Sequence, residues 1–408
     1  MKVLVINAGS SSVKYYLYDM PQAEVLSRGS VERIGEKNSE LAHFFADKTY
    51  RQQTQVKNVE DAMELVLETL VREDVGVIKC LSQIGGVGHR VVHGGEEFTG
   101  SVLVDEAVIA SIEKFADLAP LHNPPNLAGI RAVQRRVPDV PQVACFDTAF
   151  HSTIPEVAYM YALPYELYEK YHIRRYGFHG VSHRYVARRA AAIMGRAKYD
   201  INVITCHLGN GCSIAAVKEG LSVDTSMGFT PLEGVPMGTR SGDLDPAILF
   251  YLGDKGYDVS QLKTLCNKQS GLFGISGASN DVRNLVELAK EGHERARLAI
   301  DVFCYRIKKY IGAYSAVLGV VDAVVFTGGI GENARYLRSQ ICSDMTQIGI
   351  ELDQAVNNQA KATEMRISSA DSRVTVFVIA TNEQAAIAND TYELTGQNEP
   401  IASGQCCG

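Results

Sequence analysis

The sequence has no long hydrophobic run, and this absence excludes a membrane-spanning helix. No stretch of its 408 residues approaches the roughly 18–20 consecutive apolar residues that such a helix needs. The N-terminus enters an apolar strand directly, without the basic segment of a secretory signal. With 46% hydrophobic and 21% charged residues, the composition is typical of a soluble globular protein. We therefore expect a cytoplasmic protein with no membrane partner.

Cysteine is present, but without the spacing of a disulfide framework or of a zinc ribbon. Seven of the nine cysteines are scattered singly, and only Cys406 and Cys407, in a C-terminal segment expected to fray, are adjacent. An odd number of cysteines with no C-x-x-C pair is typical of reduced thiols in the cytosol. The last four residues are not a prenylation box either, because that box needs its cysteine four residues from the end.

The chain also lacks an excess of basic residues. Its formal net charge is −7 at pH 7, which argues against nucleic acid as a partner. An anionic substrate would therefore have to be bound by a local cluster of cations. The length predicts a large core divided between two domains or lobes.

Strand and helix patterns alternate along the chain and predict an α/β fold. The periodicity predicts strands over residues 143–147, 202–207, 322–327 and 374–380, and helices over 59–72, 105–118, 281–318 (interrupted near Gly292) and 333–348.

Two segments share one pattern of strand, glycine turn and strand. The first is VLVINAGSSSVKYYLY at residues 3–18, and the second is NVITCHLGNGCSIAAVKEG at residues 202–220. The repeat indicates two related lobes that face each other across a cleft, although ordinary hairpins with glycine turns would look the same. Backbone N–H groups of such a turn can converge on a phosphate, where Gly9 permits a positive φ and Lys14 supplies a charge.

Other short segments are rich in glycine and cations. Residues 322–334, DAVVFTGGIGENA, predict a strand, a glycine turn and a helix that opens at Glu332-Asn333, whose N-terminus favours anions. No G-x-x-x-x-G-K-[ST] motif occurs, which argues against a P-loop nucleotidase. Arginine and histidine gather in the loops 88–96, 174–183 and 234–246, and fixed donors of this kind are what phosphoryl transfer needs.

The sequence favours magnesium over zinc as a bound metal. His179 and His183 have i,i+4 spacing, but the glycines around them argue against one continuous helix, and no third ligand lies close. Asn7 and Glu383 each end an apolar strand and offer the oxygen ligands that Mg²⁺ prefers beside phosphate.

Ten stretches together resemble the acetate kinase family. In chain order they are VINAGSSSVKY, GHRVVHGGE, LHNPPN, FDTAFH, YGFHGVSH, HLGNGCS, DTSMGFTPLEGVPMGTRSGDLDP, GISGASNDVR, FTGGIGEN and TNE, from residue 5 to residue 383. The resemblance implies two related lobes of the actin-like ATPase superfold, each a mixed sheet with flanking helices, and a nucleotide cleft between them. Residues 1–150 would form the first lobe, completed by a C-terminal helix over 384–408, and residues 151–383 the second. It also implies a homodimer.

The same resemblance implies an activity and a site. The activity is reversible transfer of a phosphoryl group from ATP to acetate, giving ADP and acetyl phosphate, with Mg²⁺, or Mn²⁺ in its place. The implied site consists of catalytic residues Arg90, Asp147, His179 and Arg240; substrate-binding residues Arg90, Val92, Leu121, Phe178 and Pro231; metal-binding Asn7 and Glu383; and nucleotide-binding Lys14, His207, Leu208, Gly209, Asn210, Gly211, Asp281, Val282, Arg283, Gly329, Ile330, Gly331, Glu332 and Asn333. Gln384 departs from the family's TNEE pattern, but the metal-linked Glu383 is kept.

The chemistry of a carboxylate acceptor limits what Asp147 can do. A carboxylic acid with a pKa of about 4–5 is already ionised at pH 7, so no base is needed to create the nucleophile. Asp147 would then orient an arginine or a metal-bound water, or merely cap a turn. Two other functions remain open at this point: a kinase for propionate or butyrate, and an actin- or chaperone-type switch that hydrolyses ATP to change conformation.

Overall fold

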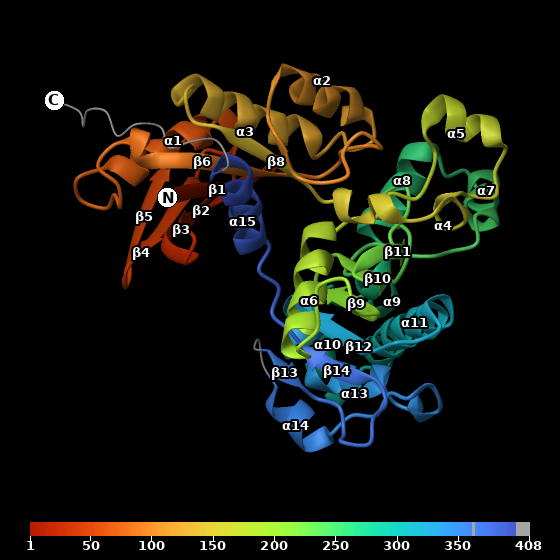
Figure 1. The fold of residues 1–408 in the computed structure, drawn as a ribbon. Helices are drawn as coiled ribbons and strands as arrows, with labels where there is room; N and C mark the ends of the chain where they lie inside the picture. The colour runs from red at the N-terminus through yellow and green to blue at the C-terminus, as the bar shows by residue number, and fades with distance from the viewer. Residues whose placement is uncertain (361–363, 397–408) are drawn as a thin grey trace. The chain divides into compact units, whose positions relative to one another are not determined.

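The computed structural model describes residues 1–360 and 364–396, and it divides into two compact units (Figure 1). The first unit combines Met1–Ala149 with the segment from Asn382 onward, and the second is Phe150–Thr381. Residues 397–408, with Cys406, Cys407 and the end of the expected C-terminal helix, lie outside the described residues. Among the described helices, none is both long and apolar enough to cross a membrane.

The first unit is built on an eight-stranded mixed sheet with the strand order β5-β4-β3-β2-β1-β6-β8-β7. β1, β6 and β8 run parallel to one another, whereas the remaining pairs are antiparallel. The strands are β1 (Lys2–Ala8), β2 (Ser12–Asp19), β3 (Glu24–Glu32), β4 (Ser39–Phe45), β5 (Lys48–Thr54), β6 (Ile84–Val91), β7 (Val102–Leu103) and β8 (Gln142–Phe146).

Helices cover apolar side chains of this sheet. α1 (Val59–Val71) and α3 (Asn123–Arg136) share a core with apolar side chains of β1 and β2, and α2 (Glu106–Lys114) packs in a second cluster with β8. α15 (Glu383–Gly396) approaches β6 so closely that only glycine fits beneath it. A Cβ atom on Gly88 would lie 2.3 Å from the Thr391 hydroxyl and 2.7 Å from Cγ2 of Ile387. The C-terminal helix is thus an integral part of the first unit.

The second unit is built on a six-stranded sheet with the order β11-β10-β9-β12-β14-β13. β9, β12 and β14 are parallel, and β10 is antiparallel to both β9 and β11. The strands are β9 (Val203–Leu208), β10 (Cys212–Lys218), β11 (Leu221–Thr225), β12 (Ala323–Thr327), β13 (Met365–Arg366) and β14 (Thr375–Val378). The helices are α4 (Glu156–Tyr159), α5 (Tyr165–Tyr171), α6 (Gly180–Ile193), α7 (Ala247–Asp254), α8 (Val259–Lys268), α9 (Gly271–Ser276), α10 (Val282–Lys290), α11 (Glu294–Leu318), α12 (Gly328–Asn333), α13 (Arg335–Ile341) and α14 (Gln354–Gln359).

The two sheets contain the same five-stranded core. In the first unit β3-β2-β1 form an antiparallel set and β1-β6-β8 a parallel one, and β11-β10-β9 and β9-β12-β14 repeat this arrangement in the second. The hairpins β1–β2 and β9–β10 hold equivalent positions. The fold expected from the sequence, two related lobes of mixed sheet with flanking helices, is therefore confirmed.

Two local predictions need correction, and the positive φ that the sequence permits at Gly9 is not adopted. The helix predicted over 333–348 ends at Ile341, and only a 3₁₀ turn follows at Thr346–Ile348. The glycines of TGGIGEN do not precede a helix that opens at Glu332, because α12 already begins at Gly328. Gly9 does not adopt a positive φ; its N–H closes the turn by donating to the carbonyl of Ser12 at 2.8 Å, a geometry that needs no left-handed residue.

Candidate active site

In the first unit, three predicted site residues meet at one edge of the sheet. Asn7 lies in β1, Arg90 in β6, and Asp147 directly follows β8. Because these three strands are parallel neighbours, their carboxyl ends lie side by side. Nε of Arg90 donates to Oδ1 of Asp147 at 3.0 Å, Nη2 donates to Oδ2 of the same carboxylate, and Nη1 donates to Oδ1 of Asn7 at 3.3 Å.

The charges in this cluster keep the arginine ionised. Burial opposes the charged form of Arg90, but the carboxylates of Asp147 and Glu383 outweigh it and hold the pKa of Arg90 above its ordinary value. Glu383, in the first turn of α15, thus contributes its charge to the same cluster. Asp147 itself is only 2% exposed, so its carboxylate is compensated mainly by this arginine.

Lys14 belongs to the same edge through the hairpin. It pairs with Asn7 in the antiparallel register of β1 and β2, and its side chain is exposed. The hairpin therefore presents an exposed cation beside the cluster of Asn7, Arg90 and Asp147.

In the second unit, His179 and Arg240 converge on Gly211. A Cβ atom built on Gly211 would lie 3.2 Å from Cε1 and Nε2 of His179 and 3.5 Å from Nη2 of Arg240. His179 precedes α6 with φ 57° and ψ 24°, a left-handed conformation that a non-glycine residue adopts at a cost of order 1–3 kcal/mol. This strained backbone directs the imidazole toward the glycine turn between β9 and β10.

Arg240 is fixed by the main chain and not by a carboxylate. Its Nη1 donates to the carbonyl of Pro231 at 2.7 Å, and no carboxylate within the described residues forms an ion pair with it. Burial lowers the pKa of Arg240. A partly buried cation without a counter-charge favours an anionic ligand.

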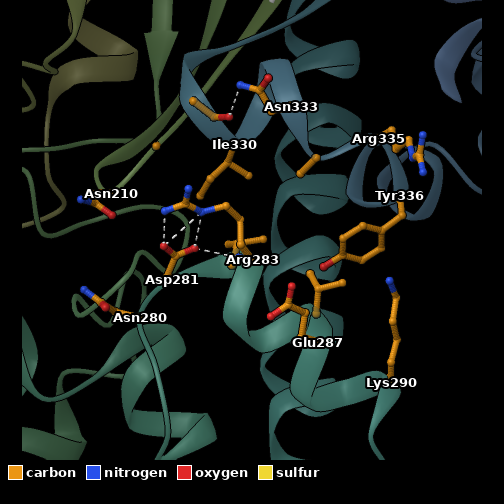
Figure 2. A pocket seen from close by; sticks show the side chains of 15 residues that line it. Asn210, Asn280, Asp281, Arg283, Glu287, Lys290, Ile330, Asn333, Arg335 and Tyr336 are labelled. Atoms are coloured by element: carbon orange, nitrogen blue, oxygen red, sulfur yellow. Dashed lines mark hydrogen bonds and ion pairs between the residues drawn. The ribbon is translucent and has the colours of Figure 1, made fainter. Parts of the chain in front are cut away.

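A pocket of about 710 Å³ lies in the second unit (Figure 2). Eight of the predicted nucleotide-binding residues line it: Gly209, Asn210, Asp281, Val282, Arg283, Gly329, Ile330 and Asn333. Asp281 caps α10 by accepting from the N–H of Arg283, and the side chain of Arg283 returns to its carboxylate with Nη2 2.6 Å from Oδ2. These hydrogen bonds lower the pKa of Asp281.

Other predicted nucleotide-binding residues of the second unit lie outside the lining of this pocket: His207, Leu208, Gly211, Gly331 and Glu332. Leu208 and Gly331 are buried in the fold. Oε1 of Glu332 accepts from the N–H groups of Gly328 at 3.0 Å and Thr381 at 3.2 Å, so this side chain joins the ends of β12 and β14.

The pocket also has lining residues that the sequence did not indicate. They are Asn280, Val286, Glu287, Lys290, Ala334, Arg335 and Tyr336. Figure 2 shows Tyr336 and Glu287 on the same side of the pocket. Val286, Glu287 and Lys290 follow Val282 and Arg283 at helical spacings of three or four on α10, and this periodicity could have identified them.

The four predicted acyl-pocket residues are divided between the units. In the first, Val92 is buried two residues after Arg90, whereas Leu121 is 67% exposed. In the second, Phe178 is buried directly before His179, and Pro231 accepts from Arg240 through its carbonyl.

Comparison with known proteins assigns the chain to a family. A family model described as the acetokinase family matches residues 2–389. The acetate kinase of Pseudothermotoga lettingae is 52% identical over 395 residues, which are 97% of each chain. This chain belongs to the acetokinase family. The family's enzymes are kinases, so the chain is a phosphotransferase.

Two solved structures match nearly the whole chain. Acetate kinase from Porphyromonas gingivalis has a TM-score of 0.93 at 47% identity, and a propionate kinase from Francisella tularensis has 0.90 at 44%. Each match covers 96% of this chain and 99% of the other. The fold described above is therefore that of acetokinase-family enzymes.

Proposed function

We propose that this chain is an acetate kinase that transfers the γ-phosphoryl group of ATP directly to acetate. The observation that carries the proposal is the cluster of Asn7, Arg90 and Asp147 in a chain 52% identical to an acetate kinase. A partly buried arginine held by a carboxylate is suited to bind a second, substrate carboxylate.

The acceptor needs binding and charge compensation, not deprotonation. One oxygen of the ionised acetate forms the new bond to the γ-phosphorus, while the bond between that phosphorus and the β–γ bridging oxygen breaks and ADP leaves. Arg90 binds the acetate, and the bidentate contact with Asp147 fixes the plane of the guanidinium. Of the roles open to Asp147, these contacts support the orientation of an arginine.

The donor side of the reaction belongs to the second unit. The pocket lined by Gly209, Asp281 and Ile330 would bind the nucleotide. His179 and Arg240, which converge on Gly211, would donate hydrogen bonds to the phosphoryl group, whose charge spreads over its equatorial oxygens during transfer.

The residues of the first unit also suit Mg²⁺, with Mn²⁺ as an alternative. Asn7 and Glu383 offer the hard oxygen ligands that this ion prefers, and both belong to the charge cluster around Arg90. No group of three or more His, Cys, Asp or Glu among the described residues is placed to hold a metal by itself. The ion would therefore take its other ligands from water and nucleotide phosphates, where it neutralises negative charge.

A homodimer and a cytoplasmic location belong to the same proposal. α7 carries the apolar residues AILFYL, yet none of its residues is buried, and Phe250 and Tyr251 are 73% and 61% exposed. An exposed apolar helix of this kind is typical of a protein interface. A second copy of the chain would cover it through a two-fold contact. Because the reaction consumes ATP, we place the enzyme in the cytoplasm.

A second candidate is a propionate kinase, because the Francisella tularensis enzyme of that name is 44% identical. A hydroxamate assay tests both. The purified chain with ATP and Mg²⁺ should form acyl phosphate faster from acetate than from propionate at equal concentration. ATP hydrolysis that is independent of any carboxylate would instead indicate a conformational switch.

A further inference from the structure

A chain of hydrogen bonds runs from the core of the second unit to His179. Oγ1 of Thr205 lies 2.7 Å from Nδ1 of His183, and Nε2 of His183 lies 2.7 Å from Oγ of Ser213. The same Ser213 oxygen lies 2.8 Å from Nδ1 of His179. Thr205, His183 and Ser213 are all fully buried, so water does not compete for these bonds.

Burial favours the neutral form of His183. Burial, followed by the charges of His151 and His207, holds the pKa of His183 well below its ordinary value. A neutral imidazole has one N–H and one bare nitrogen. Because each nitrogen faces a hydroxyl, one hydroxyl must donate to His183 and the other must accept from it.

The Thr205 hydroxyl determines which partner donates in each of these hydrogen bonds. The described residues give this hydroxyl no partner other than His183. If Thr205 accepted, its own hydrogen would be buried without an acceptor, which is unfavourable. Thr205 therefore donates to Nδ1 of His183, and Nε2 of His183 donates to Ser213.

The donor and acceptor roles of Ser213 determine which nitrogen of His179 carries the hydrogen. Its oxygen accepts from His183, and the described residues offer its hydrogen no acceptor other than Nδ1 of His179, so Ser213 donates to that nitrogen. We propose that Thr205, His183 and Ser213 are positioning residues that hold His179 as the neutral tautomer with its hydrogen on Nε2. A cationic His179 would donate from Nδ1 to Ser213. The Ser213 hydrogen would then either be buried without an acceptor or turn toward His183, and the second arrangement would leave the Thr205 hydrogen without an acceptor.

This tautomer matches the role proposed above for His179, on which the mechanistic part of the inference rests. Nε2 of His179 is the nitrogen on the side of Gly211 and of Nη2 of Arg240. With its hydrogen there, the ring donates toward a phosphoryl group, whereas a bare nitrogen would repel the oxygens. The buried chain thus makes a neutral histidine a fixed donor.

The tautomer can be measured without any assay of activity. Nitrogen-15 spectra of histidine-labelled protein distinguish protonated from bare ring nitrogens, and comparison with His179→Gln assigns one of the ten histidines. We expect Nε2 of His179 to be protonated and Nδ1 bare. The opposite neutral tautomer, or an imidazolium at pH 7, would overturn the proposal even if the enzyme proved to be an acetate kinase.

Two substitutions of Thr205 test whether its hydroxyl determines the tautomer of His179. Thr205→Val keeps the shape of the side chain but removes the donor, whereas Thr205→Ser keeps the donor. In Thr205→Val we expect a mixture of His179 tautomers and a kcat lowered by about tenfold, the low end of what outer hydrogen-bond partners of functional histidines contribute. KM for acetate and ATP should change little, and Thr205→Ser should restore both spectrum and kcat.

The outcomes separate this inference from the proposed function. A Thr205→Val spectrum identical to wild type would refute the hydrogen-bond chain. A shifted spectrum with unchanged kcat would show that the tautomer does not matter for transfer, and would remove His179 from the reaction without touching the acetate assignment.

Discussion

Arg90 and Asp147 form a two-point ion pair in which Nε and Nη2 of the guanidinium donate to the two oxygens of one carboxylate. Asp147 is almost fully buried, whereas the Arg90 side chain remains 21% exposed. Both oxygens of the aspartate are engaged by the arginine, and the third nitrogen, Nη1, faces Asn7. This arrangement is consistent with the proposal that Asp147 orients Arg90 and that Arg90 binds the substrate carboxylate.

Removing the arginine should therefore abolish most of the catalysis. We expect Arg90→Ala, and likewise Arg240→Ala, to lower kcat/KM by two or more powers of ten, because one charged donor in a preorganised site contributes about 3–4 kcal/mol. Steady-state kinetics on folded protein measures this. Arg131→Ala is a matched control, since Arg131 is exposed and its one ion pair among the described residues is with Glu113. Near-normal turnover in Arg90→Ala would remove that residue from the site.

A side chain at position 211 should lower the catalytic rate because it would contact two predicted catalytic residues. The φ of Gly211 is not positive, but a Cβ would come within 3.2 Å of the His179 ring and 3.5 Å of Arg240. Gly211→Ala should displace one or both by tenths of an ångström and lower kcat by about tenfold, since misplacement of about 1 Å can cost 10²-fold. Gly312→Ala, on α11 of the same unit, is the control, because its Cβ would meet nothing within 4 Å. Equal losses in both variants would show that the loss does not come from contact with His179 or Arg240.

The metal assignment predicts a selective effect at Glu383. We expect Glu383→Gln to raise the Mg²⁺ concentration needed for half-maximal rate while the KM for acetate stays nearly constant, because a carboxylate binds the ion more strongly than an amide. Glu393→Gln, an exposed position on the same helix, should leave the titration unchanged. An unaltered Mg²⁺ titration in Glu383→Gln would contradict the assignment.

Buried histidines predict loss of stability in mild acid. Burial lowers the pKa of His89 and of His151 from 6.5 to about 4. Between these values the unfolded chain binds protons that the native chain does not, so the free energy of unfolding decreases as the pH falls. Each such histidine contributes a slope of about 1.4 kcal/mol per pH unit within this window.

Denaturant titrations between pH 4 and 7 measure this slope. His151→Gln should reduce the slope of the unfolding free energy against pH by the contribution of one histidine, about 1.4 kcal/mol per pH unit. The slope is the readout, because the substitution itself can change stability at every pH. An unchanged slope would mean that His151 titrates alike in the folded and unfolded states.

The sequence predicts best the parts of this fold that local patterns determine. Apolar strands and glycine turns were sufficient to predict both hairpins, and Gly292 marks the break between α10 and α11. The early end of α13 was not predicted, and neither were the distant contacts of Arg338 within this helix. Arg338, fully buried, donates to carbonyls of Gly331, Glu332 and Ala360 and to Asn357, and no sequence rule expects a buried arginine without a carboxylate.

In the candidate site, too, local motifs indicated some residues and the fold alone brought in others. The sequence motifs indicated Arg90, Asp147 and His179, and Arg90 lies in β6 and not in the expected loop. Thr205 and Ser213 lie inside ordinary apolar strands. A buried hydroxyl on a strand has no local signal, because only the fold brings it to a histidine. The sequence therefore could not identify the residues that position His179.

The last prediction concerns the length of the acyl chain. Val92 is buried, follows Arg90 by two residues, and is fixed because its N–H donates to Oδ1 of Asn126 at 3.1 Å. If it contacts the methyl group of acetate, its branched side chain leaves little room for more carbon. An extra methylene changes binding in such a pocket by about 1–3 kcal/mol, or roughly 10–200-fold, so propionate should be a poorer substrate and butyrate poorer still.

Val92→Ala should raise kcat/KM for propionate relative to acetate, measured by competition or by separate hydroxamate assays. Val102→Ala, a partly buried valine packed on another cluster of the same unit, controls for general loosening and should leave the ratio unchanged. An unchanged ratio in folded Val92→Ala would place the acyl pocket elsewhere. A wild-type enzyme that prefers propionate would favour the function of the Francisella tularensis relative over acetate, because the side chains next to Arg90 would then accommodate the longer chain without any substitution.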